Sequence, residues 1–210
     1  MREALQERVG KPHLSYSSLK YALGDMKLWE MYMKGQLKKK SEALYFGSLY
    51  DLLLFEPEKF NDMYYTLDDS DIVDAIGGKS LYDKRFAGGK FQVEFNVDLD
   101  GIPLKGFLDC LREGEFIVDS KSSRSIDKFR YDVNSWSYDI QAYIYTKVFG
   151  IKDYYWVVQE KAYPFYPADV KCSDETLFRG EMKFHQALEN IQDYLNGKTE
   201  ISTHYSTFVV

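Results

Sequence analysis

Three neighbouring segments of this chain are rich in aromatic and β-branched residues and are separated by short turns. The segments are FQVEFNVDL (91–99), PLKGFLDCLRE (103–113) and EFIVDSK (115–121), and the turns lie at Asp100-Gly101 and Glu113-Gly114. Both turns end in glycine, which adopts a positive φ without strain. The pattern predicts three consecutive antiparallel strands, and this meander fixes the face on which each of their side chains must lie.

The second predicted hairpin brings two aspartates together. If its turn closes at Glu113-Gly114, Asp109 on the outgoing strand lies opposite Asp119 on the returning strand. Cross-strand neighbours on one face sit about 5 Å apart, which is close enough for two carboxylates to share a metal ion. Lys121 follows Asp119 by two residues, so both side chains point to the same face.

This combination of side chains suits the hydrolysis of a phosphodiester. A hard divalent cation such as Mg²⁺ needs only a few carboxylates when substrate phosphate oxygens and water complete its shell. The ion lowers the pKa of a bound water, and an ammonium group orients that water or offsets charge on the phosphate. An Asp-x-Lys pattern is also common as a solvated ion pair, so the motif alone does not decide between these interpretations.

Further motifs extend over most of the chain. In order they are Ser15-Tyr16-Ser17-Ser18-Leu19-Lys20, Phe46-Gly47-Ser48-Leu49-Tyr50, Glu56-Pro57-Glu58-Lys59-Phe60, Asp109, Asp119-Ser120-Lys121, Gln141-Ala142-Tyr143-Ile144-Tyr145 and Gln159-Glu160-Lys161-Ala162-Tyr163-Pro164. With these motifs the chain resembles the PD-(D/E)xK nuclease superfamily, within it the RecE-type and RecB-type exonucleases, including the exodeoxyribonuclease VIII-like enzymes of phage recombination. The resemblance implies an α/β fold, a restriction-endonuclease-like core with a mixed central sheet flanked by helices.

The resemblance also implies roles for individual residues. Asp109, Asp119, Lys121 and Gln141 correspond to catalytic positions, with Mg²⁺ or Mn²⁺ bound by the two aspartates. Tyr145 would support the site or contact DNA. Without the family, Gln141 and Tyr145 belong to an ordinary amphipathic face of a helix over residues 137–149.

Two glutamates are further candidates for the acidic set. Glu94 lies on the strand before Asp109 and would be an additional metal ligand, although a solvated glutamate on a half-buried strand explains it equally well. Glu160 has the same ambiguity. Both therefore rank below the aspartates.

One position departs from the family pattern. Many relatives carry a metal-binding histidine where this chain has Tyr50, and a neutral phenol is a poor ligand for a hard cation. The change argues against a two-metal site and leaves one-metal catalysis through Asp109 and Asp119 open. It also leaves open a degenerate fold that binds DNA ends or a protein partner without cutting.

The activity that the resemblance implies is exonucleolytic cleavage of linear double-stranded DNA. Relatives of the phage recombination type degrade DNA from the 5′ end, pass the exposed strand to a single-strand annealing protein and often form rings, so a homo-oligomer is expected. Endonucleolytic cleavage remains an alternative. The resemblance favours the exonuclease.

The distribution of charge is compatible with DNA as the partner. The net charge of the 210-residue chain is −6, but seven acidic residues and one lysine between Glu56 and Asp74 account for all of it. Basic residues follow the predicted site at Lys121, Arg124, Lys128 and Arg130, and others lie at residues 34 and 38–40. We expect Arg124 and Lys128 to hold the DNA backbone, with Ser122 and Tyr145 as further contacts.

Composition sets the remaining limits. With 45% hydrophobic residues, residues 1–210 can form one domain, divided into an N-terminal helical part (1–60), a catalytic sheet core (90–170) and a closing helix (173–196). No membrane-spanning run or signal peptide is evident, which predicts a cytoplasmic protein of a bacterium or a phage-infected cell. The two cysteines, Cys110 and Cys172, lack the spacing of a zinc or iron–sulfur site.

The remaining helices and strands are predicted from the hydrophobic periodicity and from the residues that begin or end each element. Helices are predicted at 14–34, capped by Ser15 and ended by Gly35, at 42–55, at 138–149 and at 174–195, with a short helical stretch within 68–89. Further strands are predicted at 154–160 and 165–170. We expect replacement of Asp119 by alanine to leave folding intact, because the aspartate would serve a metal and not the core.

Overall fold

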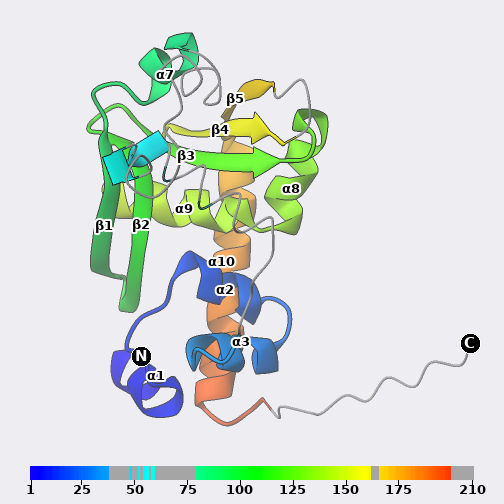
Figure 1. Ribbon diagram of the computed structural model, residues 1–210. Coiled ribbons are helices and arrows are strands. Elements are labelled where there is room, and N and C mark those ends of the chain that lie inside the picture. The colour runs from blue at the N-terminus through cyan, green and yellow to red at the C-terminus, as the bar shows by residue number, and fades with distance from the viewer. Residues whose placement is uncertain are drawn as a thin grey trace, which may run out of the picture.

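The computed structural model describes residues 1–37, 79–161 and 166–199, together with residues 48, 52, 54–56, 58 and 59. Figure 1 shows the helices and strands in these ranges. Along the chain they are α1 (Arg2–Val9), α2 (Tyr16–Ala22), α3 (Met26–Met33), α7 (Lys79–Arg85), β1 (Lys90–Leu99), β2 (Ile102–Arg112), β3 (Phe116–Ser123), the 3₁₀ turn η1 (Ile126–Lys128), α8 (Phe129–Ser135), α9 (Tyr138–Phe149), β4 (Tyr154–Glu160), β5 (Pro167–Lys171) and α10 (Asp174–Leu195).

The strands form one mixed sheet in the order β1-β2-β3-β4-β5. The three hairpin-type pairs are antiparallel, whereas β3 and β4 are parallel. A parallel pair needs a long crossover, which η1, α8 and α9 provide between β3 and β4. The mixed sheet and the predicted three-strand meander are therefore confirmed.

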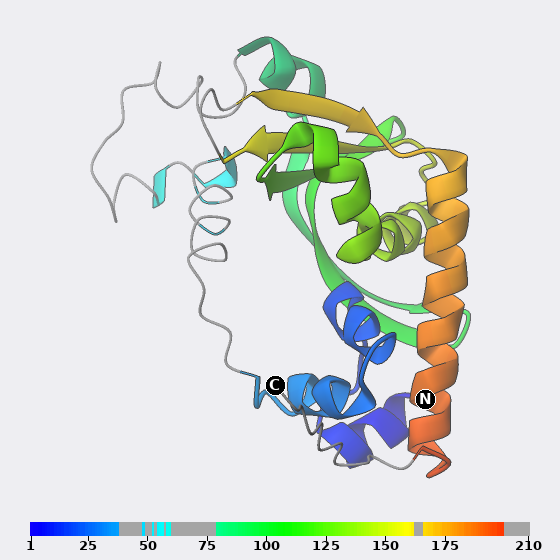
Figure 2. The same cartoon turned by 90° about the vertical axis from the view of Figure 1, so that its right-hand side faces the viewer.

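Alternate strand residues pack on opposite faces of the sheet. Ile117 and Trp156 belong to the main core beneath α9 and α10, whereas Val118 and Val157 belong to a smaller core with Phe86, next to α7. Figures 1 and 2 show α9 and α10 on one side of the sheet and α7 at its edge on the other. These strands carry β-branched and aromatic residues on both faces. A sheet that is covered on both sides requires this pattern.

The N-terminal helices pack around the lower half of α10 (Figure 2). The predicted helix over 14–34 is wrong in one respect, because it is two helices. Gly24 follows the end of α2, and Asp25 caps α3 by accepting a hydrogen bond from the Lys27 backbone N–H at 2.8 Å. Glycine disfavours helix and aspartate favours the cap, so the chain breaks there.

The other predicted ends of helices and strands are mostly confirmed where the structure describes them. Ser15 caps α2 through a reciprocal capping box with Ser18, and Gly35 ends the region with φ of 70°. The segments 138–149, 154–160 and 174–195 match α9, β4 and α10. The strand predicted at 165–170 begins instead at Pro167. Most of the helix predicted at 42–55, together with Tyr50 and residues 38–40, lies outside the described residues.

Both cysteines are buried in the cores. Cys110 lies in the smaller core and Cys172 in the main core, and neither forms a disulfide. Burial raises the pKa of each thiol to about 12. In the part of the chain that is described, no helix has the length and apolar character needed to cross a membrane.

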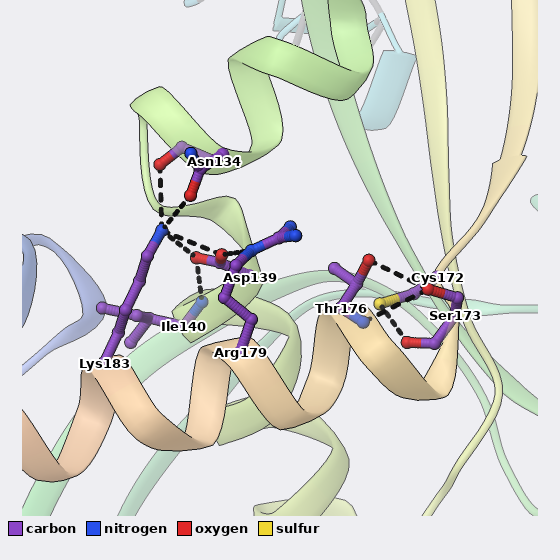
Figure 3. Close-up of polar contacts among 8 residues, drawn as sticks. All are labelled: Asn134, Asp139, Ile140, Cys172, Ser173, Thr176, Arg179 and Lys183. Carbon is purple, nitrogen blue, oxygen red and sulfur yellow. Dashed lines mark hydrogen bonds and ion pairs between the residues drawn. The ribbon is translucent and has the colours of Figure 1, made fainter.

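A buried carboxylate joins α9 to α10 (Figure 3). Asp139 is fully buried, and its oxygens accept hydrogen bonds from Arg179 at 2.6 Å and from Lys183 at 2.9 Å. The Lys183 ammonium also donates to the backbone and side-chain oxygens of Asn134, at the end of α8. A single lysine therefore holds α8, α9 and α10 together.

The same contact depends on a glycine. A Cβ atom added at Gly180 would come within 2.1 Å of the Asp139 backbone oxygen, and that neighbour is main chain and cannot rotate away. Glycine in the middle of a helix is normally unfavourable. Its presence here is explained by the close approach of α10 to α9.

We therefore expect Gly180→Ala to destabilise the protein. On helix propensity alone the change would stabilise a helix by about 1 kcal/mol, but the clash with Asp139 should lower the free energy of unfolding by about 1–3 kcal/mol. Urea denaturation followed by circular dichroism measures this. Met182→Ala, at an exposed position of the same helix, is the control and should change stability little. A stabilised Gly180→Ala variant would show that the close approach is not required.

Candidate active site

Four of the predicted residues meet at the point where β2 separates from β3. Asp109 comes from β2, Asp119 and Lys121 from β3, and Gln141 from α9. The Lys121 ammonium forms an ion pair with Asp119, and the Gln141 Nε2 atom donates to Asp119 Oδ1 at 2.7 Å. The Asp119 side chain is only 1% exposed and that of Lys121 15%. The site is thus a buried charged cluster and not a solvated ion pair.

The register places the two aspartates as the sequence predicts. Cys110 pairs with Val118, and the backbone ladder between β2 and β3 ends there, so Asp109 and Asp119 are the next residues on each strand. Beyond that point the Asp109 side chain, and not the β2 backbone, forms the hydrogen bond to β3. Its Oδ2 atom accepts a hydrogen bond from the Ser120 backbone N–H at 2.8 Å. A carboxylate therefore replaces a ladder hydrogen bond at the opening between the strands.

Strand β1, which pairs with β2, is irregular next to Asp109. Phe91 pairs with Cys110 and Val93 with Leu108, and Gln92 between them has a φ of 49°. Phe91 and Cys110 lie in the smaller core, whereas Val93 and Leu108 lie in the main core. The residues before and after Gln92 therefore lie on opposite faces of the sheet, and so do the residues before and after Asp109. Irregularities of this kind commonly re-aim a side chain beside a functional site.

Lys121 is held in its charged form by the two carboxylates. Although burial by itself lowers its pKa, the charges of Asp119 and Asp109 raise the pKa of Lys121 above its usual value. Its Nζ atom also donates to the Ser120 backbone oxygen at 3.1 Å and lies 5.0 Å from the centre of the Tyr138 ring. At neutral pH this side chain is a hydrogen-bond donor and a positive charge, and not a base.

The cluster contains more carboxyl groups than cations. Burial raises the pKa of Asp109, while Lys121 and the Ser120 N–H oppose that shift. When both carboxylates are ionised, one ammonium leaves a net charge of −1 in a place where an uncompensated charge is costly, and burial therefore favours a proton on Asp109. A cation bound here would remove that cost, so Asp109 and Asp119 fit a divalent metal that completes its shell with water and phosphate oxygens.

The structure also limits the size of this ligand set. Among the described residues, no group of three or more histidine, cysteine, aspartate or glutamate side chains is placed to hold a metal ion. The protein atoms available to a cation here are therefore those of the two aspartates and neighbouring neutral oxygens.

A chain of hydrogen bonds fixes the orientation of Gln141. The Tyr145 hydroxyl donates its proton to the Phe107 carbonyl oxygen at 2.8 Å, so it presents only an acceptor to Gln141. The Gln141 amide must therefore direct Nε2 toward Tyr145, at 3.4 Å, and toward Asp119. Its Oε1 atom is buried and has no hydrogen-bond partner among the described residues. An unsatisfied acceptor of this kind is costly unless a donor such as a water binds there.

Comparison with known protein families identifies the domain to which these residues belong. Residues 69–202 match the family described as PDDEXK-like domain of unknown function (DUF3799). The chain belongs to this family.

A solved structure shares the fold of this PDDEXK-like domain. A candidate exonuclease from Eubacterium rectale is 22% identical, with a TM-score of 0.69, over 95% of this chain and 85% of that one. A phage-related exonuclease from Haemophilus somnus 129PT is 13% identical, with a TM-score of 0.43, over 89% of this chain and 96% of its own. The first supports the fold, and the second is too distant to add to it. No significant match was found among curated proteins.

The cluster has further neighbours that were not predicted from the sequence. Tyr16 is half-buried beside Lys121 and Asp119, and Tyr138 faces Lys121. Burial raises the pKa of Tyr16, Tyr138 and Tyr154, so these hydroxyls remain protonated. The available signal was the Ser15 to Lys20 motif, in which Tyr16 occupies a position that the pattern leaves variable.

Other predicted residues lie outside the cluster. Glu94 is not brought to the aspartates, since its side chain is 51% exposed and pairs with Lys105 at 2.7 Å. Glu160 accepts the Ile126 backbone N–H at 3.3 Å and so supports η1. Tyr145 is buried at 5% exposure, which favours its supporting role over contact with DNA.

The predicted DNA contacts on the other side of the cluster are more accessible. Ser122 is half-buried on β3, and Arg124 and Lys128 are exposed just beyond it. Both cations follow the end of β3, within seven residues of Lys121 in the chain. No described contact assigns either cation to an ion pair that would neutralise it.

We expect Tyr145→Phe to weaken the orientation of Gln141 and to lower the free energy of unfolding by about 1 kcal/mol, because the Phe107 carbonyl loses its donor and the buried Gln141 amide loses an acceptor. Urea denaturation provides the measurement. Tyr143→Phe is the matched control in the same helix, since its hydroxyl donates to Glu181 at 3.1 Å in a less buried setting. Equal losses in the two variants would contradict the hydrogen-bond chain described here.

Proposed function

We propose that this protein is a metal-dependent deoxyribonuclease that acts as an exonuclease on linear double-stranded DNA. The observation that carries the proposal is the convergence of Asp109, Asp119, Lys121 and Gln141 in one buried cluster of a PDDEXK-like domain. Two carboxylates and an ammonium group suit phosphodiester hydrolysis because the reaction needs both a cation site and stabilisation of phosphate charge.

The residues divide the chemistry in the following way. Asp109 and Asp119 would hold Mg²⁺ or Mn²⁺, which when bound polarises the phosphate and lowers the pKa of a water. Lys121 donates hydrogen bonds to the phosphate or to the attacking water and offsets negative charge. Gln141 holds Asp119 through Nε2, and its Oε1 atom accepts a hydrogen from the attacking water.

Exonucleolytic action, its 5′ to 3′ direction and a role in phage-type recombination rest on the sequence resemblance. The same resemblance suggests a ring-shaped homo-oligomer and a single-strand annealing protein as partner. Light scattering tests the oligomer directly, and the labelled end of the substrate tests the direction. Neither result bears on whether the cluster is catalytic.

The first expected outcome concerns cleavage itself. With Mg²⁺ or Mn²⁺ the protein should degrade end-labelled linear duplex and leave closed circular plasmid intact, and EDTA should stop the reaction. Asp119→Asn should lower the rate at least about a thousand-fold, which corresponds to ~4 kcal/mol of barrier. The burial of Asp119 against Lys121 corrects the expectation that Asp119→Ala leaves folding intact. Alanine would leave a buried ammonium without its partner and reduce stability, so asparagine is the better test.

Each alternative has its own result in that experiment. Cutting of the circle would identify an endonuclease. Absence of cleavage with either metal, in a protein that still binds duplex, would identify a non-catalytic binder. Cleavage by Asp119→Asn at the wild-type rate would remove the cluster from the mechanism.

The second expected outcome concerns the exposed cations after β3. Arg124→Ala and Lys128→Ala should each weaken duplex binding and reduce the slope of log Kd against log salt by about 0.9, because each would remove one phosphate contact. Fluorescence anisotropy in EDTA at several salt concentrations measures the slope. Lys152→Ala, an exposed lysine before the start of β4, is the control. An unchanged slope in both variants would exclude these residues from the DNA path.

A further inference from the structure

The side chain of Trp136 lies unusually exposed beside the candidate active site. It is 51% exposed, whereas Trp29 and Trp156 are 0% and 1% exposed. Trp136 lies between α8 and α9, two residues before Tyr138, whose ring faces the Lys121 ammonium at 5.0 Å. Two residues span at most about 7 Å of backbone. An exposed indole therefore lies two residues along the chain from a ring that contacts Lys121 of the candidate site.

The backbone of Trp136 is held from both sides. Its carbonyl oxygen accepts the Tyr16 hydroxyl proton at 2.7 Å, and its N–H donates to the Asp132 carbonyl at 2.8 Å. The first of these bonds comes from α2, which lies beside the junction of α8 and α9 (Figure 2). The ring is thus presented by a fixed backbone, which reduces the entropy lost on binding a ligand.

The electrostatic setting selects an anionic ligand with a flat aromatic part. The Lys20 ammonium lies 4.7 Å from the centre of the Trp136 ring. Between residues 121 and 136 four cations, at 121, 124, 128 and 130, outnumber two acids, at 127 and 132. An indole beside one ammonium group, with further cations nearby in the chain, matches the pattern of single-strand binding sites, in which bases stack on aromatic rings and cations follow the phosphates.

We propose that Trp136 is a stacking platform for an unpaired nucleobase of a DNA strand whose phosphates pass Lys20 and Lys121. The proposal rests on the proposed nuclease function and names the part of the substrate that the site holds. A base inside a duplex is already stacked on its neighbours, so the platform binds a base at a frayed end or in a separated strand. This assigns to Trp136 a role in binding and none in the chemical step.

Fluorescence makes the test direct, because Trp136 is the exposed tryptophan of the three in the chain. A labelled twelve-residue oligo(dT) strand is titrated against the whole protein in EDTA, with tryptophan emission and label anisotropy followed together. Wild type should show quenching that saturates with the anisotropy. Trp136→Ala should raise Kd at least about ten-fold, as loss of one stacked base does elsewhere.

Two variants separate stacking from general damage. Trp136→Phe keeps a ring, so its Kd should stay within about three-fold of wild type while the quenching disappears. Phe178→Ala removes an aromatic side chain that is 62% exposed on α10 and should leave both signals unchanged. Thermal melting confirms that each variant is folded.

The outcomes separate this proposal from the proposed function. Cleavage that depends on Asp119, together with equal affinity of wild type and Trp136→Ala for the strand, would overturn the platform and leave the nuclease intact. Saturating quenching and the expected loss in Trp136→Ala, without cleavage under any condition, would support the platform in a protein that binds and does not cut. A wild type that cuts duplex but gives no quenching with oligo(dT) would also overturn the platform.

Discussion

A lysine ammonium held inside the protein is the constraint on which the rest of this site depends. Lys121 keeps its charge because Asp119 and Asp109 lie against it, and those carboxylates in turn need donors from the surrounding chain. The Ser120 N–H satisfies one of them and the Gln141 amide the other. Three separate elements, β2, β3 and α9, must therefore be in place before any one of these charges can be buried.

Helix α9 has a double role in this arrangement. At its first turn Asp139 binds α10, and half a turn later Gln141 reaches Asp119 on the opposite side of the helix. The Asp139 network and the candidate active site are thus joined by a few residues of backbone. Any shift of α9 relative to α10 would move the Gln141 amide, which links a purely structural contact to the geometry of the site.

Much of the sheet could be predicted because its signals are local. The glycine turns and the alternation along residues 91–121 determine the register, and the register brings Asp109 level with Asp119. The ends of α9, β4 and α10 could be predicted from the sequence for the same reason. Gln141 was predicted as a site residue from the family resemblance. Amphipathic periodicity alone assigns it to an ordinary helix face.

What could not be predicted depends on contacts between distant segments. The positive φ of Gln92 and the change of face beside Asp109 follow from packing on two separate cores. Tyr16 enters the site because α2 folds against α9, more than a hundred residues away in the chain. Glu94 was a reasonable acidic candidate, but its partner is Lys105 on the neighbouring strand, and no pattern within one strand reveals that pairing.

The burial of both native thiols makes this chain a convenient subject for site-specific chemistry. Cys110 and Cys172 are the two cysteines of the sequence, and each is inside a core with a pKa of about 12. Maleimides and other electrophiles react with exposed thiolates, which neither residue provides in the folded protein. A cysteine introduced at a surface position would carry a spin label or a dye selectively, without removal of the native pair.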